Sequence, residues 1–169
     1  MGRYNRRWSM RSIATFAIAA GLPALLVLVS AAQTGGDSSQ KRKTVMMTRL
    51  YTGPDGQTHA EEIEAKFTEG SPTNPAAKLL SITGAELHRA AAGTVQDWHT
   101  APRRQYVITL SGQGEVEVAG GKKIHLGPGH IDLVEDTTGK GHITRTLGNE
   151  ERVTLTLPLA DQSGRSSSR

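Results

Sequence analysis

The chain has 169 residues, a net charge of +4 and no cysteine. This length allows one domain with an ordinary core once a leader of about 40 residues is set aside. The lack of cysteine excludes disulfide bonds, a cysteine nucleophile and thiolate metal sites. Histidine, carboxylate and amide groups remain available for a functional site.

The positive charge belongs to one end of the chain. Residues 1–44 contain seven Lys and Arg against one acidic residue, a net charge of +6. Residues 45–169 contain thirteen Lys and Arg against fifteen acidic residues, a net charge of −2. Because this larger part has few aromatic residues and no dense basic stripe, we expect no nucleic-acid partner.

The N-terminal segment, residues 1–32, has the order of an export signal. Four arginines precede an uncharged run whose apolar centre is 13–29, and small residues follow at 30–32. This order is typical of a secretory signal peptide. The run is also nearly long enough to cross a bilayer, so a retained membrane anchor is the alternative. Either reading predicts a hydrophobic N-terminal helix and a periplasmic, secreted or membrane-anchored protein.

Other readings of this segment stay open. Arg6 and Arg7 before Trp8 are similar to a twin-arginine export signal. An organelle transit peptide also fits a segment with many arginines and no early acidic residue. If the true start is Met46 or Met47, the protein is instead cytoplasmic.

Short strand-like runs separated by turn signals occupy residues 46–160, without a sustained helical period. The flanking segments 33–45 and 161–169 are polar and small-residue-rich, which predicts a flexible linker and a disordered tail. At least seven strands in one domain predict an all-β barrel or sandwich, and closure as a jelly roll would protect the strand edges. We expect strands at 60–67, 86–91, 105–110, 114–118, 122–126, 130–134, 142–147 and 152–157.

A glycine- and histidine-containing stretch in the middle of the chain resembles the first conserved motif of the cupin superfamily. Gly93, His99 and Gly112 stand at the motif spacing. Ala101 stands where a second histidine belongs, and Gln105 stands where a glutamate belongs. The spacing of the motif is therefore kept while two of its ligand positions are replaced.

The second cupin motif is matched less closely. Gly129, Gly139 and His142 fall on it when the loop 135–138 is allowed two extra residues, and Thr146 replaces an asparagine. The resemblance covers essentially the whole domain. The resemblance implies a cupin double-stranded β-helix, that is, a jelly-roll barrel.

The resemblance also implies where a metal would bind. In metal-binding cupins the motif residues converge inside the barrel, and the inherited set here is His99, Gln105 and His142. An amide oxygen is a weak, uncharged ligand, which implies a reduced or absent site unless Asp97 or Glu135 completes it. The cofactor is then one divalent transition metal (Fe, Mn, Zn or Ni), or no metal at all.

Residues near the mouth of the implied barrel are candidates for ligand binding. Of Arg103 and Arg104, strand alternation lets at most one reach the lumen, where a guanidinium could bind a carboxylate or phosphate. We predict Arg104, Trp98 and Gln105 as ligand-binding residues, with core packing as the alternative for Trp98. His130 and Asp132 share one strand face, which we expect to be an exposed polar face.

The cupin fold does not assign a chemistry by itself. The leading hypothesis is a cupin that binds a small molecule in the barrel lumen, with a reduced or absent metal site. One alternative is a metal-dependent oxygenase or isomerase acting on a small carboxylated or enolic substrate, and another is a structural or interaction cupin. Whether the protein is an enzyme stays open. A homodimer, and a membrane contact through an uncleaved N-terminal segment, are compatible with each hypothesis.

Overall fold

The computed structural model describes residues 42–163. The expected N-terminal helix in residues 1–32, most of the 33–45 linker and residues 164–169 of the tail lie outside the described residues. Within the described part, no helix has the length and hydrophobicity needed to cross a membrane.

The described residues form twelve strands and one short 3-10 helix. The strands are β1 (Met46–Thr52), β2 (Thr58–Glu64), β3 (Glu69–Ser71), β4 (Asn74–Ala76), β5 (Glu86–Ala90), β6 (Val95–His99), β7 (Gln105–Ser111), β8 (Gln113–Glu117), β9 (Lys123–Leu126), β10 (Ile131–Val134), β11 (His142–Leu147) and β12 (Arg152–Pro158). The 3-10 helix, Ala119–Gly121, connects β8 to β9.

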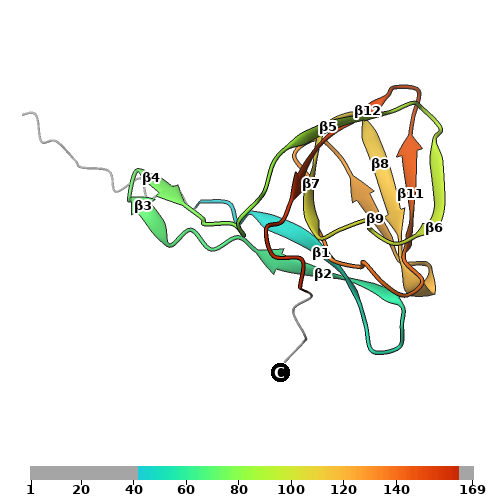
Figure 1. The fold of residues 1–169 in the computed structure, drawn as a ribbon. Helices are drawn as coiled ribbons and strands as arrows, with labels where there is room; N and C mark the ends of the chain where they lie inside the picture. The colour runs from blue at the N-terminus through green and yellow to red at the C-terminus, as the bar shows by residue number, and fades with distance from the viewer. Residues whose placement is uncertain (1–41, 164–169) are drawn as a thin grey trace, which may run out of the picture. The chain divides into compact units, whose positions relative to one another are not determined.

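Two sheets surround a common interior (Figure 1). One sheet has six strands in the order β2-β1-β10-β7-β12-β5, and the other has four strands in the order β6-β11-β8-β9. All neighbours in these sheets are antiparallel except β1 and β10, and β3 pairs with β4 as a separate hairpin. The all-β prediction is confirmed, and the architecture is the jelly-roll barrel implied by the cupin resemblance.

Each of the eight predicted strands overlaps a strand of the structure, but the predicted ranges miss β1, β6 and the β3–β4 hairpin. Strand β6 is exposed along most of its length and pairs on one side only, with β11. An exposed edge strand has no apolar alternation, which is the signal on which strand prediction depends.

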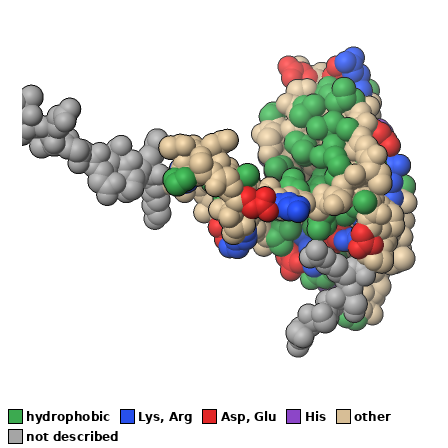
Figure 2. Space-filling view, turned by 60° about the vertical axis from the view of Figure 1, so that its left-hand side comes forward, with side chains coloured by type: hydrophobic (Ala, Val, Ile, Leu, Met, Phe, Trp, Pro, Cys, Tyr) green, Lys and Arg blue, Asp and Glu red, His purple; other side chains and the backbone are tan. Residues whose placement is uncertain are grey.

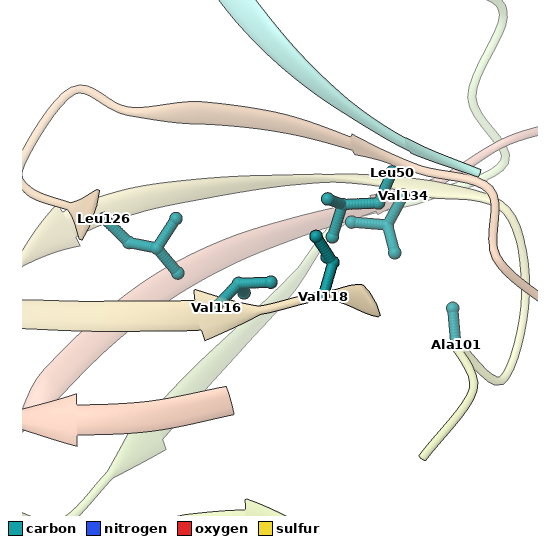
Figure 3. Packing of buried hydrophobic residues seen from close by; sticks show 6 residues of the cluster. All are labelled: Leu50, Ala101, Val116, Val118, Leu126 and Val134. Atoms are coloured by element: carbon teal, nitrogen blue, oxygen red, sulfur yellow. The ribbon is translucent and has the colours of Figure 1, made fainter. Parts of the chain in front are cut away.

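Apolar residues pack on both sides of the six-stranded sheet. The inner cluster contains Leu50, Ala101, Val116, Val118, Leu126 and Val134 (Figure 3). A second cluster includes Met47, Tyr106 and Leu133, which alternate along β1, β7 and β10 with lumen-facing residues. Because successive strand residues point to opposite faces, this second cluster lies on the outer side of the sheet.

Candidate functional site

A cavity of about 510 Å³ lies between the two sheets. The inner apolar cluster supplies one wall, including Leu50, Val116, Leu126 and Val134. The rest of the lining is mainly polar. Small-molecule sites typically have volumes of about 300–1,000 Å³ and combine apolar walls with a few placed polar groups. The lumen therefore has the size and composition of a small-molecule site.

His99 and His142 lie side by side in the lining of this cavity. They are register partners on β6 and β11, and their ring centroids lie 4.5 Å apart. Gly141 permits this approach, because it has a φ of 76° and a Cβ at this position would collide with the carbonyl oxygen of His99. The structure thus brings together the two histidines that the cupin motifs singled out.

Hydrogen bonds orient both imidazoles through Nδ1. The Nδ1 atom of His142 lies 2.6 Å from Oδ2 of Asp136, a fully buried carboxylate that also accepts a 2.9 Å bond from the Thr58 hydroxyl. The Nδ1 atom of His99 donates to the backbone oxygen of Asp97 at 2.7 Å. Neither Nε2 atom has a hydrogen-bond partner within residues 42–163. Each ring therefore has its Nε2 atom available to a bound group.

Gln105 lines the same cavity, but its amide oxygen is already engaged. That oxygen accepts a 3.3 Å hydrogen bond from Nε of Arg103. The Arg103 guanidinium in turn pairs with both carboxylate oxygens of Glu86, at 2.5 and 2.6 Å. Ala101, at the position of the second motif histidine, is part of the apolar wall.

The donor set does not fit a tightly held divalent metal. Among residues 42–163, no group of three histidine, cysteine or acidic side chains is placed to hold a metal ion. Neither Asp97 nor Glu135 lines the cavity, and Glu135 is instead bonded by Arg49 and Arg104. Because the Gln105 amide oxygen is already hydrogen-bonded, the two imidazoles alone fall short of the three protein ligands that zinc and iron sites usually have.

Arg104 and Trp98, two of the predicted ligand-binding residues, do not line this cavity. The buried Arg104 guanidinium bonds to Glu135 and to the backbone oxygens of Asp161 and Ser163, at 2.7 and 2.6 Å. Arg103 is the member of the arginine pair that reaches the lumen. Trp98 is 36% exposed, so the alternative prediction that it packs in the core is also wrong. The Nζ atom of Lys140 lies 3.9 Å from the centroid of the Trp98 ring.

The sequence patterns missed the polar wall of the cavity. Along β12, Arg152, Thr154 and Thr156 are buried and line the lumen. Asp132 of β10 is also buried there, and its Oδ1 lies 3.0 Å from Nε2 of His130, so the expectation of an exposed polar face is wrong. The alternation in β12 was visible in the sequence, but by itself it favours the apolar set as the inner face.

The outer face of β12 carries the apolar members of the same alternation. Val153, Leu155 and Leu157 alternate with the lumen-facing polar residues, and Leu155 is opposite Leu87 of β5. Leu87 and Leu110 are exposed. Figure 2 shows hydrophobic side chains gathered on one face of the domain. The polar groups of β12 are therefore enclosed in the barrel while apolar groups of the sheet lie outside.

The described residues thus form a two-sheet jelly roll whose polar-walled lumen is lined by a pair of histidines. Solved structures of similar fold include an RmlC-like cupin protein from Desulfovibrio desulfuricans, with 15% identity and a TM-score of 0.35 over 69% of this chain and 82% of that one. A cupin protein from Bacteroides fragilis has 20% identity and a TM-score of 0.36, over 52% and 74% of the two chains. The Cnp3 cupin domain of Schizosaccharomyces pombe has 15% identity and a TM-score of 0.35, over 70% and 85%. No protein-family model and no curated protein matches the sequence.

Proposed function

We propose that this protein binds a small polar organic molecule in the barrel lumen, with the metal site reduced to two histidines. The cavity of about 510 Å³, apolar on one wall and polar on the other, is the observation that carries the proposal. The apolar wall provides contact area, and the polar wall provides orientation and selectivity.

Hydroxyl groups of the polar wall are available to such a molecule. Thr144 and Thr146 on β11 and Thr154 and Thr156 on β12 all line the cavity. None of these hydroxyls has a side-chain hydrogen bond within the described residues, although three of the four residues are buried. A hydroxyl that faces the cavity can both donate and accept a hydrogen bond, so these hydroxyls support a ligand with several polar atoms.

The metal content of the protein tests the reduced site. Protein purified without chelator and analysed by elemental mass spectrometry is expected to hold far less than one transition metal per chain. Near-stoichiometric metal that disappears in the His99→Ala/His142→Ala double variant would overturn the proposal. That result would favour a metal-dependent oxygenase or isomerase.

Blocking the lumen tests small-molecule binding. Val116→Phe places a larger side chain in the cavity, whereas Val153→Phe makes the same change on the outer side of β12. Fragments detected by ligand-observed NMR are expected to bind the wild type and the Val153→Phe variant but not Val116→Phe. Fragments that bind all three proteins equally would place binding outside the lumen and contradict the proposal.

One observation favours a second candidate function, a metal-free isomerase. The Asp136–His142 pair directs an available Nε2 atom to the cavity, which is the arrangement of a general base held by a carboxylate. Such a base can take a proton from the carbon beside a carbonyl group. Deuterium exchange at that carbon in small keto acids, lost in His142→Gln, would support this candidate, and absence of exchange would reject it.

A further inference from the structure

Arg152 is a buried cation in the lumen that has no ion-pair partner among residues 42–163. The residue is 7% exposed, and its guanidinium donates to Oγ1 of Thr109 on β7, from Nη2 at 2.8 Å and from Nε at 3.2 Å. No carboxylate oxygen of the described residues lies within 4.0 Å of its nitrogens. A buried charge without a counter-ion is costly, so this arrangement is expected where a ligand supplies the charge.

The carboxylate that affects the pKa of Arg152 is that of Asp132, and this carboxylate is already paired with His130. Oδ1 of Asp132 is paired with Nε2 of His130 at 3.0 Å. Burial lowers the pKa of Arg152, and attraction by Asp132 does not fully offset this effect. The Nη1 atom of Arg152 has no protein partner in the described residues and retains two N–H donors. The guanidinium therefore keeps donor capacity on the lumen side.

A strand of the four-stranded sheet leaves room for this side chain. Gly114 of β8 faces Arg152, and a Cβ at position 114 would lie 2.9 Å from its Cδ and 3.0 Å from its Nε. Any other residue at this position would press on the arginine. The space around Arg152 is therefore provided by the barrel itself.

The other arginines of the lining are already paired. Arg103 is bonded to Glu86, and Arg89 lies 3.4 Å from Glu151. Within the described lining, Arg152 is thus the arginine whose charge has no paired carboxylate. One unpaired guanidinium balances one negative charge, which favours a monocarboxylate over a doubly charged phosphate.

We infer that Arg152 binds the carboxylate of the lumen ligand, and that this ligand is a small hydroxylated monocarboxylate. The inference rests on the proposed function and specifies its ligand class. The hydroxyls of Thr144, Thr146, Thr154 and Thr156 belong to the same lining and are the natural partners of the ligand's own hydroxyl groups.

Titration calorimetry with matched probes tests the inference. Glycerate and gluconate are the carboxylates, glycerol and glucose the neutral polyols, and inorganic phosphate the competing anion. We expect the carboxylates to bind the wild type and to bind Arg152→Gln about 30-fold or more weakly, the loss typical of removing a buried charged partner. Arg145→Gln is the matched control, because Arg145 is paired with Glu115 and Glu117 and does not line the cavity.

Three outcomes would overturn the inference. Equal binding of carboxylates and neutral polyols would show a lumen site without charge selection, which leaves the proposed function standing. Stronger binding of phosphate than of the carboxylates would assign the wrong ligand class. Unchanged carboxylate affinity in Arg152→Gln would remove Arg152 from the site.

Thermal unfolding separates a binding role from a structural one if Arg152→Gln binds no probe. If Arg152 serves to bind a ligand, the ligand-free Arg152→Gln variant should unfold at or above the midpoint temperature of the wild type. The carboxylates should then raise the midpoint temperature of the wild type only. A variant that unfolds well below Arg145→Gln, with no carboxylate effect on the wild type, would show that Arg152 is structural and overturn the inference.

Discussion

Two buried arginines of this barrel differ in their partners. Arg104 is 1% exposed and Arg152 is 7% exposed. The Arg104 guanidinium is bonded to the carboxylate of Glu135 and to two backbone oxygens, whereas within the described part of the chain the Arg152 guanidinium is bonded only to the hydroxyl of Thr109. Burial alone therefore does not distinguish a structural arginine from one available to a ligand, and the partner set does.

Glu135 joins Arg104 and Arg49 in one cluster of paired charges. It lies between Arg104 and Arg49, with its Oε2 atom 2.6 Å from Nε of Arg49. Burial tends to raise the pKa of Glu135, but the two guanidinium groups outweigh burial and lower it. The pKa of Arg49 is raised by Glu61 and Glu135 against the opposing effect of burial, while that of Arg152 is lowered. The two regions thus have opposite electrostatic balances.

Removing Glu135 should produce the largest effect. Glu135→Gln leaves two arginines facing a neutral side chain, and we expect the free energy of unfolding to fall by about 3–5 kcal/mol in urea denaturation at pH 7. Glu61→Gln is the control, because Glu61 also pairs with Arg49 but its side chain is 45% exposed, and its loss should cost less than about 1 kcal/mol. Equal losses in both variants would contradict a buried cluster.

The same variant has a pH signature. Because the folded-state pKa of Glu135 is lowered, its stabilisation is present above the unfolded-state pKa and is lost as the pH falls through the folded-state value. The wild type should therefore lose this part of its stability below about pH 4, and Glu135→Gln should not. Parallel pH profiles for the two proteins would reject this role of the carboxylate.

The second largest expected effect is the difference in unfolding free energy between variants of Arg104 and Arg152. Arg104→Met should lower the free energy of unfolding by about 3 kcal/mol, because it removes a partner of a buried carboxylate. Arg152→Met should lie within about 1 kcal/mol of the wild type or be more stable, because it removes a buried charge without a paired carboxylate. Urea denaturation of both variants measures the difference, and the reverse order would refute the distinction drawn between the two sites.

A smaller change tests the space around Arg152. Gly114→Ala places a methyl group against a flexible side chain, so the cost in stability should be only about 1 kcal/mol. The displaced guanidinium should nevertheless bind carboxylates about tenfold more weakly by calorimetry. Gly84→Ala is the control, because a Cβ there meets nothing within 4 Å. Unaltered carboxylate binding in Gly114→Ala would show that the position of Arg152 does not matter.

The smallest expected effect concerns His130. Its hydrogen bond to the Asp132 carboxylate raises the pKa of His130 against the opposing effect of burial. This stabilisation is complete below the unfolded-state pKa and is lost as the pH rises through the folded-state value, a change of at most about 1 kcal/mol. NMR titration should show a lower His130 pKa in Asp132→Asn and no change in Asp55→Asn, and an unchanged His130 in Asp132→Asn would contradict the pairing.

Several features of the barrel could be predicted from local patterns. Alternating residues and turn signals located eight of the strands, because strand periodicity is a property of the chain itself. The motif spacing singled out His99 and His142, which meet in the lumen. Strand β1 was missed as well as β3, β4 and β6, and the last three are mostly exposed, which removed the apolar pattern that would have revealed them.

The sequence by itself determined the all-β class, most of the strands and the histidine pair. Only the tertiary structure decided which face of each strand is inside and which arginine reaches the lumen. A period of two defines two faces but not their orientation, and the outer side of the six-stranded sheet carries an apolar cluster of its own. The apolar residues of β12 could therefore lie outside while Arg152 and its threonine neighbours faced inward. The partners of Arg104 and Arg152 are far away in the sequence, so only the tertiary structure could show that, among the described residues, a carboxylate pairs with Arg104 and none pairs with Arg152.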